Sequence, residues 1–400
     1  MSDDSTRSRW QVSRLALVAS AFVVLLLVAG CGGGSSSTSG ETSQGSETSE
    51  GESGGGGEEA SAAVTESQEF FEEHLETPTE IFLTESVSKA PEPGKNIVYA
   101  DCGAPICHVI GASVQEAVEA VGWNYKTVNL GGLPEQVSNA WDQIVQEEPD
   151  GVIGAGTPRT LFKHQFKELG DKNIPYVTAS VPEEPAGAQI ATITGPPDFV
   201  IRGQWMARWV VADSGGDANV VFVNLPEYPI LIGEEEEFLK EFEHLCPECG
   251  VDVLPVSQTE LGKEVPSKVV SYIQSHPDTN YMVGGQADTT LGVPQALRAA
   301  SLNDVKIISQ AGTPSNFENI ADGTAEIVNV PEPEPMFGYT LVDALVRHYN
   351  GDSLPLKEYA TLPRQYLTEE NIADPEIVKN GVYQGVPGFR EQYEQLWKLK

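Results

Sequence analysis

Short apolar runs alternate with segments of helical periodicity from residue 95 onward. An apolar run of about four to eight residues is typical of a buried strand, whereas apolar residues spaced three or four apart indicate a helix that faces a core. The first predicted strand is 96–100 and the first predicted helix is 109–121. This alternation predicts a parallel sheet with helices on both of its faces.

Two groups of such elements follow each other along the chain. The first group adds strands at 125–130, 151–154, 174–178 and 189–194, and helices at 134–148 and 157–169. The second group has strands at 219–223, 251–256, 281–283, 305–308, 326–330 and 361–367, and helices at 199–212, 230–245, 265–275, 289–300, 336–349 and 390–397. The predicted fold class is therefore α/β, with two doubly wound, Rossmann-like lobes and a cleft between them.

The first 30 residues have a different pattern, in which basic residues precede an unbroken apolar run at 15–29. The run is shorter than the roughly 20 residues of a membrane-spanning helix, and the arrangement is typical of a secretory signal peptide. Val28-Ala29-Gly30-Cys31 resembles the bacterial lipoprotein signal. The resemblance implies removal of 1–30 and lipidation of Cys31; the alternative is a plain cleavage site followed by a chance cysteine.

Gly, Ser, Thr and Glu dominate much of the next segment, 31–67, which has the composition of a flexible tether. Residues 68–94 are expected to form an N-terminal extension, with a short helix predicted at 66–76. Two or more acyl chains are enough to hold a protein on a membrane. We therefore expect the rest of the chain to lie on the extracytoplasmic face of the cell membrane, held there only by the lipid on Cys31.

The charge balance restricts the class of partner. The chain has 24 basic and 59 acidic residues, for a net charge of −35. Nucleic-acid binding requires a basic surface, so nucleic acid is excluded as a partner. Docking on anionic lipid is disfavoured for the same reason.

The cysteines other than Cys31 form two close pairs, Cys102 with Cys107 and Cys246 with Cys249. Because disulfides persist outside the cytoplasm, we predict two local bridges. A four-cysteine zinc site and a redox site are the alternatives, although Cys246 follows a predicted helix rather than a strand. The six histidines show no close pairing, so we expect no metal site and no cofactor.

Short motifs stand at the ends of the predicted strands. They are Ala104-Pro105-Ile106, Asn173-Ile174-Pro175-Tyr176-Val177, Gln286-Ala287-Asp288 before Leu291-Gly292, Gly312-Thr313-Pro314 and Asn329-Val330-Pro331. In this order and spacing they resemble the type 1 periplasmic binding proteins, the ribose-binding-like, sugar-type receptors of ABC importers, over residues 95–367. The resemblance implies a lobe 1 of 95–194 and 331–359, and a lobe 2 of 195–330 and 360–400. It also implies a three-segment hinge near 190–196, 325–331 and 360–367.

Ligands of such sheets bind beyond the carboxyl ends of the strands. Where the family has an Asp and an Arg that hold sugar hydroxyls, this chain has Ser180 and Val181, and Ile106 and Cys107 replace aromatic residues. The remaining amide and hydroxyl groups suit a small solute with fewer hydroxyls than a simple sugar. The candidate ligand-binding residues are Asp101, Ile106, Thr157, Ser180, Val181, Tyr228, Gln286, Gln310 and Asn329.

The resemblance implies a monomeric solute-binding lipoprotein that closes on a small molecule by hinge motion and delivers it to an ABC transporter permease. A receptor of the same fold that signals to a membrane kinase or chemoreceptor is the alternative function. For single residues, Thr157 and Ser180 have helix capping as an alternative role, and Tyr228 has ordinary packing. The sequence shows no nucleophile–base constellation, so we expect the protein not to be an enzyme.

Overall fold

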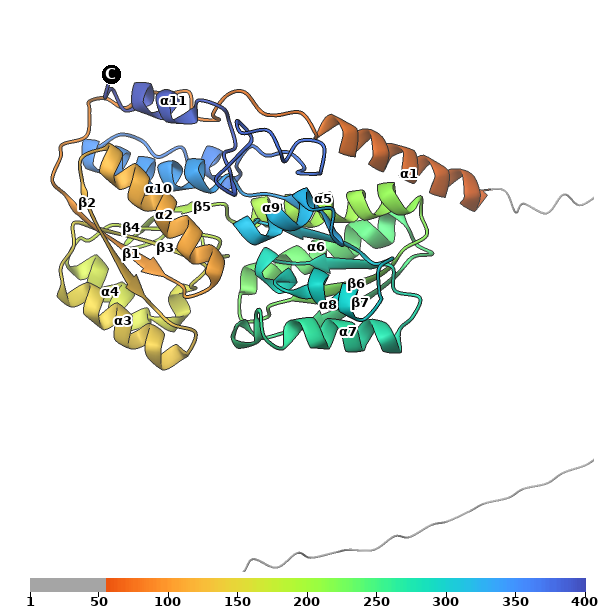
Figure 1. Ribbon diagram of the computed structural model, residues 1–400. Coiled ribbons are helices and arrows are strands. Elements are labelled where there is room, and N and C mark those ends of the chain that lie inside the picture. Colours follow the sequence, from red (N-terminus) through yellow and green to blue (C-terminus); the bar gives the residue numbers. More distant parts are fainter. Residues whose placement is uncertain (1–54) are drawn as a thin grey trace, which may run out of the picture. The chain divides into compact units, whose positions relative to one another are not determined.

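Two five-stranded parallel sheets form the frame of residues 55–400, the part of the chain that the computed structural model describes (Figure 1). Each sheet belongs to its own doubly wound lobe, as the sequence predicts. The predicted signal peptide, Cys31 and most of the predicted tether lie outside the described residues. Within 55–400, no helix is both long enough and apolar enough to cross a membrane.

Lobe 1 is built on one sheet with the strand order β2-β1-β3-β4-β5. Its strands are β1 (Asn96–Asp101), β2 (Asn124–Asn129), β3 (Gly151–Ala155), β4 (Tyr176–Ala179) and β5 (Gln189–Ile193). Successive side chains of a strand point to opposite faces, so Ile97 and Tyr99 pack under α2 and α10 while Val98 packs toward α3 and α4. These helices are α2 (Pro105–Ala120), α3 (Pro134–Gln146), α4 (Lys163–Asp171) and α10 (Glu334–Asn350).

Lobe 2 repeats the design with the strand order β10-β9-β8-β6-β7. Its strands are β6 (Asn219–Asn224), β7 (Gly250–Pro255), β8 (Tyr281–Gly284), β9 (Lys306–Gln310) and β10 (Glu326–Val330). Val220 and Phe222 pack toward α5 and α6, whereas Val221 and Val223 pack toward α7 and α8. The helices are α5 (Pro196–Ser214), α6 (Pro229–Leu245), α7 (Val265–Ser275), α8 (Val293–Ala299) and α9 (Pro314–Ala321).

A glycine sets the closest helix contact in each lobe. A Cβ on Gly338 of α10 would lie 2.3 Å from the carbonyl carbon of Ser113 in α2. A Cβ on Gly203 of α5 would lie 2.6 Å from the carbonyl oxygen of Glu234 in α6. Both distances are far inside van der Waals contact, so any larger residue must push the two helices apart.

The two ends of the described chain add further connections between the lobes. Helix α1 (Gly55–Glu73) packs on α5. Its Phe71 ring also lies 4.9 Å from the ring of Tyr366, in the third segment that crosses between the lobes. Residues 81–87 then enter the lobe 1 core. After Leu367, the tail packs on α9 in lobe 2 through Ile372, Ile377 and Tyr383. It contains two short paired strands, β11 (Val378–Lys379) and β12 (Val382–Tyr383). Helix α11 (Phe389–Leu396) then returns to lobe 1, beside α10 (Figure 1).

Three expectations about the terminal segments differ from this structure. Residues 55–67 are helical rather than tether, because Ala63 and Val64 have an apolar surface of lobe 2 to pack against. The tail does not belong wholly to lobe 2, because the α11 residues Phe389 and Tyr393 are buried in the lobe 1 core. Residues 361–367 form no strand; they touch a sheet only through an antiparallel bridge between Leu367 and Asn329.

Proline shifts two of the predicted helices. The helix predicted at 157–169 begins only at Lys163, after a 3₁₀ turn at Arg159–Leu161 that follows Pro158. The helix predicted at 289–300 is divided into a 3₁₀ turn, η3 (Ala287–Thr290), and α8, which has Pro294 in its first turn. Proline has no N–H to donate and fits the first turn of a helix, so it favours a new start at that point.

Candidate functional site

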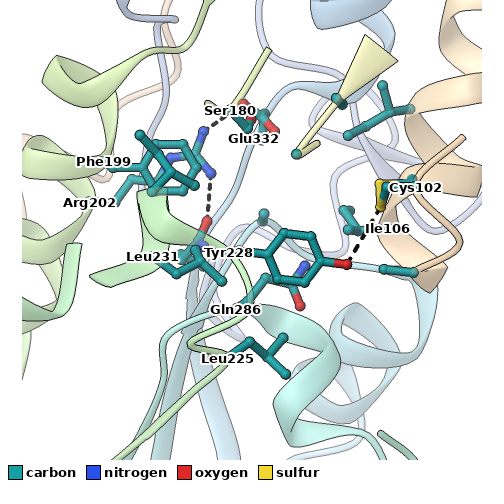
Figure 2. Close-up of a pocket in the computed structure, with 18 residues that line it drawn as sticks. Cys102, Ile106, Ser180, Phe199, Arg202, Leu225, Tyr228, Leu231, Gln286 and Glu332 are labelled. Carbon is teal, nitrogen blue, oxygen red and sulfur yellow. Dashed lines mark hydrogen bonds and ion pairs between the residues drawn. A yellow bond between two sulfur atoms is a disulfide. The ribbon is translucent and has the colours of Figure 1, made fainter. Parts of the chain in front are cut away.

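A cavity of about 60 Å³ lies between the lobes, at the carboxyl ends of both sheets (Figure 2). Lobe 1, lobe 2 and the segment between β10 and α10 all contribute to its walls. Small-molecule sites usually measure roughly 300–1,000 Å³. The lobes are therefore drawn together in this structure, and a solute of that class can enter only when they move apart.

The lobe 1 wall consists mainly of the loop from β1 into α2. Cys102 and Cys107 form a disulfide there, as predicted, and both line the cavity together with Ala104, Ile106 and Ile110. Elsewhere in lobe 1, only Ala155, Gly156 and Ser180 reach the cavity. Ser180 is thus the single polar side chain that lobe 1 contributes to the lining.

The lobe 2 wall carries most of the polar groups. Its apolar members are Phe199, Leu225, Ile230, Leu231 and Ala311, and its polar members are Arg202, Tyr228, Gln286 and Gln310. The carboxyl group of Glu332, in the segment between β10 and α10, completes the lining.

Arg202 is the centre of a buried network beside the cavity (Figure 2). Its Nε donates to Asp198 at 2.6 Å, and its two terminal nitrogens donate to Gln310 and Glu332 at 2.5 Å each. The guanidinium also lies 4.5 Å from the centroid of the Phe199 ring, within cation–π range. Arg202 is thereby fixed in place, and it orients both Gln310 and Glu332 at the cavity edge.

The same network joins all three segments that cross between the lobes. Asp198 follows the first crossing, Glu332 lies in the second, and Arg364 of the third donates to Asp198. Burial would raise the pKa of Asp198, but attraction to Arg202 and Arg364 outweighs it and holds this pKa below its ordinary value. A shift of one crossing against another therefore has to rearrange charges that line the cavity.

Other buried carboxyl groups around Arg202 are held toward the neutral form. Burial raises the pKa of Glu332 despite the nearby Arg202. Burial also raises the pKa values of Glu234 and Glu334 well above the ordinary value, and neither oxygen of either group has a hydrogen-bond partner within the described chain. An ionised carboxylate without partners is very costly to bury, so burial favours the neutral form of Glu234 and Glu334.

Asp288 of η3 makes a polar contact between the two lobes across the cleft. Its Oδ2 accepts a hydrogen bond of 3.2 Å from the Ile106 N–H at the start of α2, and its Oδ1 is buried with no partner among the described residues. Burial raises the pKa of Asp288 to about 7, although the Ile106 N–H and the charge of His108 act to lower it. Closing the cleft thus buries a carboxyl group that titrates near neutral pH.

The sequence matches the model of one protein family. Residues 97–353, more than half of the chain, match the model of the periplasmic binding protein domain. The chain belongs to this family. Membership makes it a solute-binding protein rather than an enzyme, and it agrees with the resemblance inferred from the strand-end motifs. No curated protein matches the sequence.

Solved structures of similar shape share the fold of this binding protein at low sequence identity. An ABC transporter solute-binding protein from Agrobacterium vitis bound with α-D-tagatopyranose has a TM-score of 0.63 at 18% identity, over 73% of this chain and 99% of that one. An ABC sugar transporter subunit from Rhodobacter sphaeroides has a TM-score of 0.61 at 19% identity, over 69% and 99%. A Mycobacterium smegmatis protein in complex with β-D-fucofuranose has a TM-score of 0.60 at 17% identity, over 77% and 98%.

Five of the candidate ligand-binding residues line the cavity of the binding protein. They are Ile106, Ser180, Tyr228, Gln286 and Gln310. The other four, Asp101, Thr157, Val181 and Asn329, are buried but are not part of the lining.

Two of those four have partners that account for their positions. Asp101 accepts hydrogen bonds from the Gly103 N–H and contacts the His108 ring at 2.6 Å, which fixes the loop that carries the disulfide. Asn329 donates to Ser309 at 2.8 Å. These contacts give both residues a structural role next to the site.

Sequence reasoning missed Arg202 and Glu332; the charged residue among its candidates was Asp101, which is not part of the lining. Arg202 lies within a predicted helix among apolar residues, and an arginine in such a position is a signal for a buried ion pair. Glu332 comes directly after the predicted hinge residue Pro331. The described residues contain no group of three His, Cys, Asp or Glu that could hold a metal ion.

Proposed function

We propose that this binding protein captures a small solute for an ABC importer and delivers it to a membrane permease. The observation that carries the proposal is the cavity between the lobes, to which both lobes and a crossing segment contribute. The solute would be a sugar or a less polar organic molecule. The similar structures include complexes with α-D-tagatopyranose and β-D-fucofuranose, which supports this class.

Hinge motion would provide the signal to the permease. The open form would admit the solute, and the closed form would present both lobes together. A network that joins three crossing segments to cavity-lining groups supports such coupling, because a solute that contacts Arg202 or Glu332 acts on the hinge as well.

We propose further that Cys31 is lipidated and that residues up to the start of α1 tether the protein to the extracytoplasmic face of the membrane. The basis is the sequence Val28-Ala29-Gly30-Cys31 behind an apolar run. Because α1 packs on α5, the tether would reach the protein at lobe 2.

A thermal-shift screen followed by an uptake assay tests the proposal. Monosaccharides and less polar metabolites would be added to the purified protein, and a true ligand should raise its melting temperature, because it binds only the folded form. Cells that lack the protein should then lose high-affinity uptake of that solute. A protein that binds solute while uptake remains normal would contradict the role in import.

A further inference from the structure

The two walls of the cavity differ in chemistry. Lobe 1 contributes the two half-cystines, the nearby apolar residues Ala104, Ile106 and Ile110, and also Ala155, Gly156 and Ser180. Four polar side chains come from lobe 2 and one comes from a crossing segment. A solute enclosed between these walls therefore has four polar side chains on the lobe 2 side and only Ser180 on the lobe 1 side.

The backbone of the disulfide loop adds few hydrogen-bonding groups to the lobe 1 wall. Pro105 has no N–H, the Ile106 N–H donates to Asp288, and the Cys107 N–H donates to the Ala104 carbonyl at 3.0 Å. The Gly103 N–H is also engaged, by Asp101 at 2.8 Å. The start of a helix normally has free N–H groups that a ligand can bind, but the N–H groups of Gly103, Ile106 and Cys107 are already engaged.

The disulfide holds this apolar surface in position. Cys102 precedes α2 and Cys107 lies in its first turn, so the bridge closes the loop over five residues of sequence. Both half-cystines are at least 95% buried, and the Cys102 sulfur lies 3.9 Å from the Tyr228 hydroxyl of lobe 2. The bridge is therefore both part of the wall and part of the contact between the closed lobes.

We propose that the Cys102–Cys107 disulfide determines ligand specificity, and that the solute is amphiphilic, with an apolar face toward lobe 1 and a hydrogen-bonding face toward lobe 2. The inference rests on the proposed function and adds the class of solute to it. A hydroxyl group turned toward the disulfide wall would lose water without gaining a partner. Removing that hydroxyl from the solute should therefore strengthen binding by about tenfold to a hundredfold.

The test uses matched pairs of solutes, each a common pentose or hexose and its deoxy or O-methyl analogues, such as D-galactose with D-fucose. Dissociation constants for the wild-type protein would be measured by calorimetry. In at least one pair, an analogue should bind about tenfold or more tightly than its parent. Tighter binding of the fully hydroxylated member in every responding pair would overturn the inference and leave the role in solute capture intact.

Variants then assign the preference to the disulfide. Cys102→Ser with Cys107→Ser puts two hydroxyls into the wall and should reduce the preference for the analogue by about tenfold. Cys246→Ser with Cys249→Ser is the matched control, because it removes a disulfide at the far end of α6. Neither Cys246 nor Cys249 lines the cavity. Equal preferences in the wild type and the Cys102→Ser, Cys107→Ser variant would refute the assignment.

Ile106→Asn provides a second variant in case loss of the bridge prevents folding. It places an amide in the same wall without touching the disulfide, and it should also favour the hydroxylated parent. An unchanged preference in this variant would overturn the inference. If no member of any pair binds the wild-type protein, the inferred solute class is wrong, and the metabolite screen decides separately whether the protein binds another solute.

Discussion

The carboxyl group of Asp288 should make solute affinity depend on pH. In the closed form its pKa is about 7, chiefly because of burial, whereas an exposed aspartate has a value of 3.8. When the lobes separate, Asp288 loses the Ile106 N–H and the lobe 1 surface that covers it. Its pKa should then fall toward the ordinary value, so closing takes up a proton at any pH between the two values.

The sign and size follow from these two values. Above pH 7 both forms are ionised, and closure carries the full cost of burying the charge. As the pH falls from 7 toward 3.8, the closed form becomes progressively more favourable, and solute affinity rises with it. Between pH 8 and pH 5 the expected gain is at most about a hundredfold, or about 2.7 kcal/mol at 1.36 kcal/mol per pKa unit.

Calorimetric titrations of wild type and Asp288→Asn at pH 5, 6, 7 and 8 measure this effect. The asparagine variant cannot ionise, so it should lose most of the pH dependence and bind at pH 8 at least as tightly as the wild type does at pH 5. His108 in α2, whose charge acts on Asp288, and Tyr228 are other titratable groups close to this contact. The variant His108→Gln controls for the histidine. If wild type and Asp288→Asn have the same pH profile, closure does not bury this charge and the reasoning is wrong.

Three further predictions concern packing, the buried network and the anchor. Gly338→Val should destabilise the protein by about 1–3 kcal/mol because α10 and α2 cannot separate freely, while Gly170→Ala, whose Cβ meets nothing within 4 Å, should be nearly neutral in thermal melts. Asp198→Asn leaves two buried arginines short of a counter-charge and should cost about 3–5 kcal/mol in urea unfolding, against at most about 1 kcal/mol for Asp171→Asn in an exposed pair with Lys167. Cys31→Ser should move the protein from the membrane fraction to the soluble fraction; continued membrane association would show that the anchor lies elsewhere.

Strand and helix positions in both lobes could be read from the sequence because their hydrophobic patterns are regular. Buried strands such as β3 and β6 are continuous apolar runs, and amphipathic helices such as α3 place Val137, Trp141 and Ile144 on one face. The terminal segments were harder to predict. The apolar partners of α1 include residues of α5 and Tyr366, which are distant in sequence.

The candidate site was predicted in part for a related reason. Residues at strand ends, such as Gln286 and Gln310, lie at the cleft because the topology of parallel sheets puts them there. Arg202 lies four residues after Asp198 in α5, a spacing that the sequence does show. Glu332 and Arg364 join this pair only when three distant crossings meet. No local pattern encodes that meeting, so this part of the charged network becomes visible only in the structure.

Small-angle X-ray scattering with and without solute tests most directly whether this protein closes on a ligand between its lobes. The solute identified by thermal shift would be added at saturating concentration to the full chain. We expect a smaller radius of gyration with solute than without it, since the cavity of about 60 Å³ requires an open form for entry. An unchanged radius of gyration at saturation would contradict capture by closure of the two lobes.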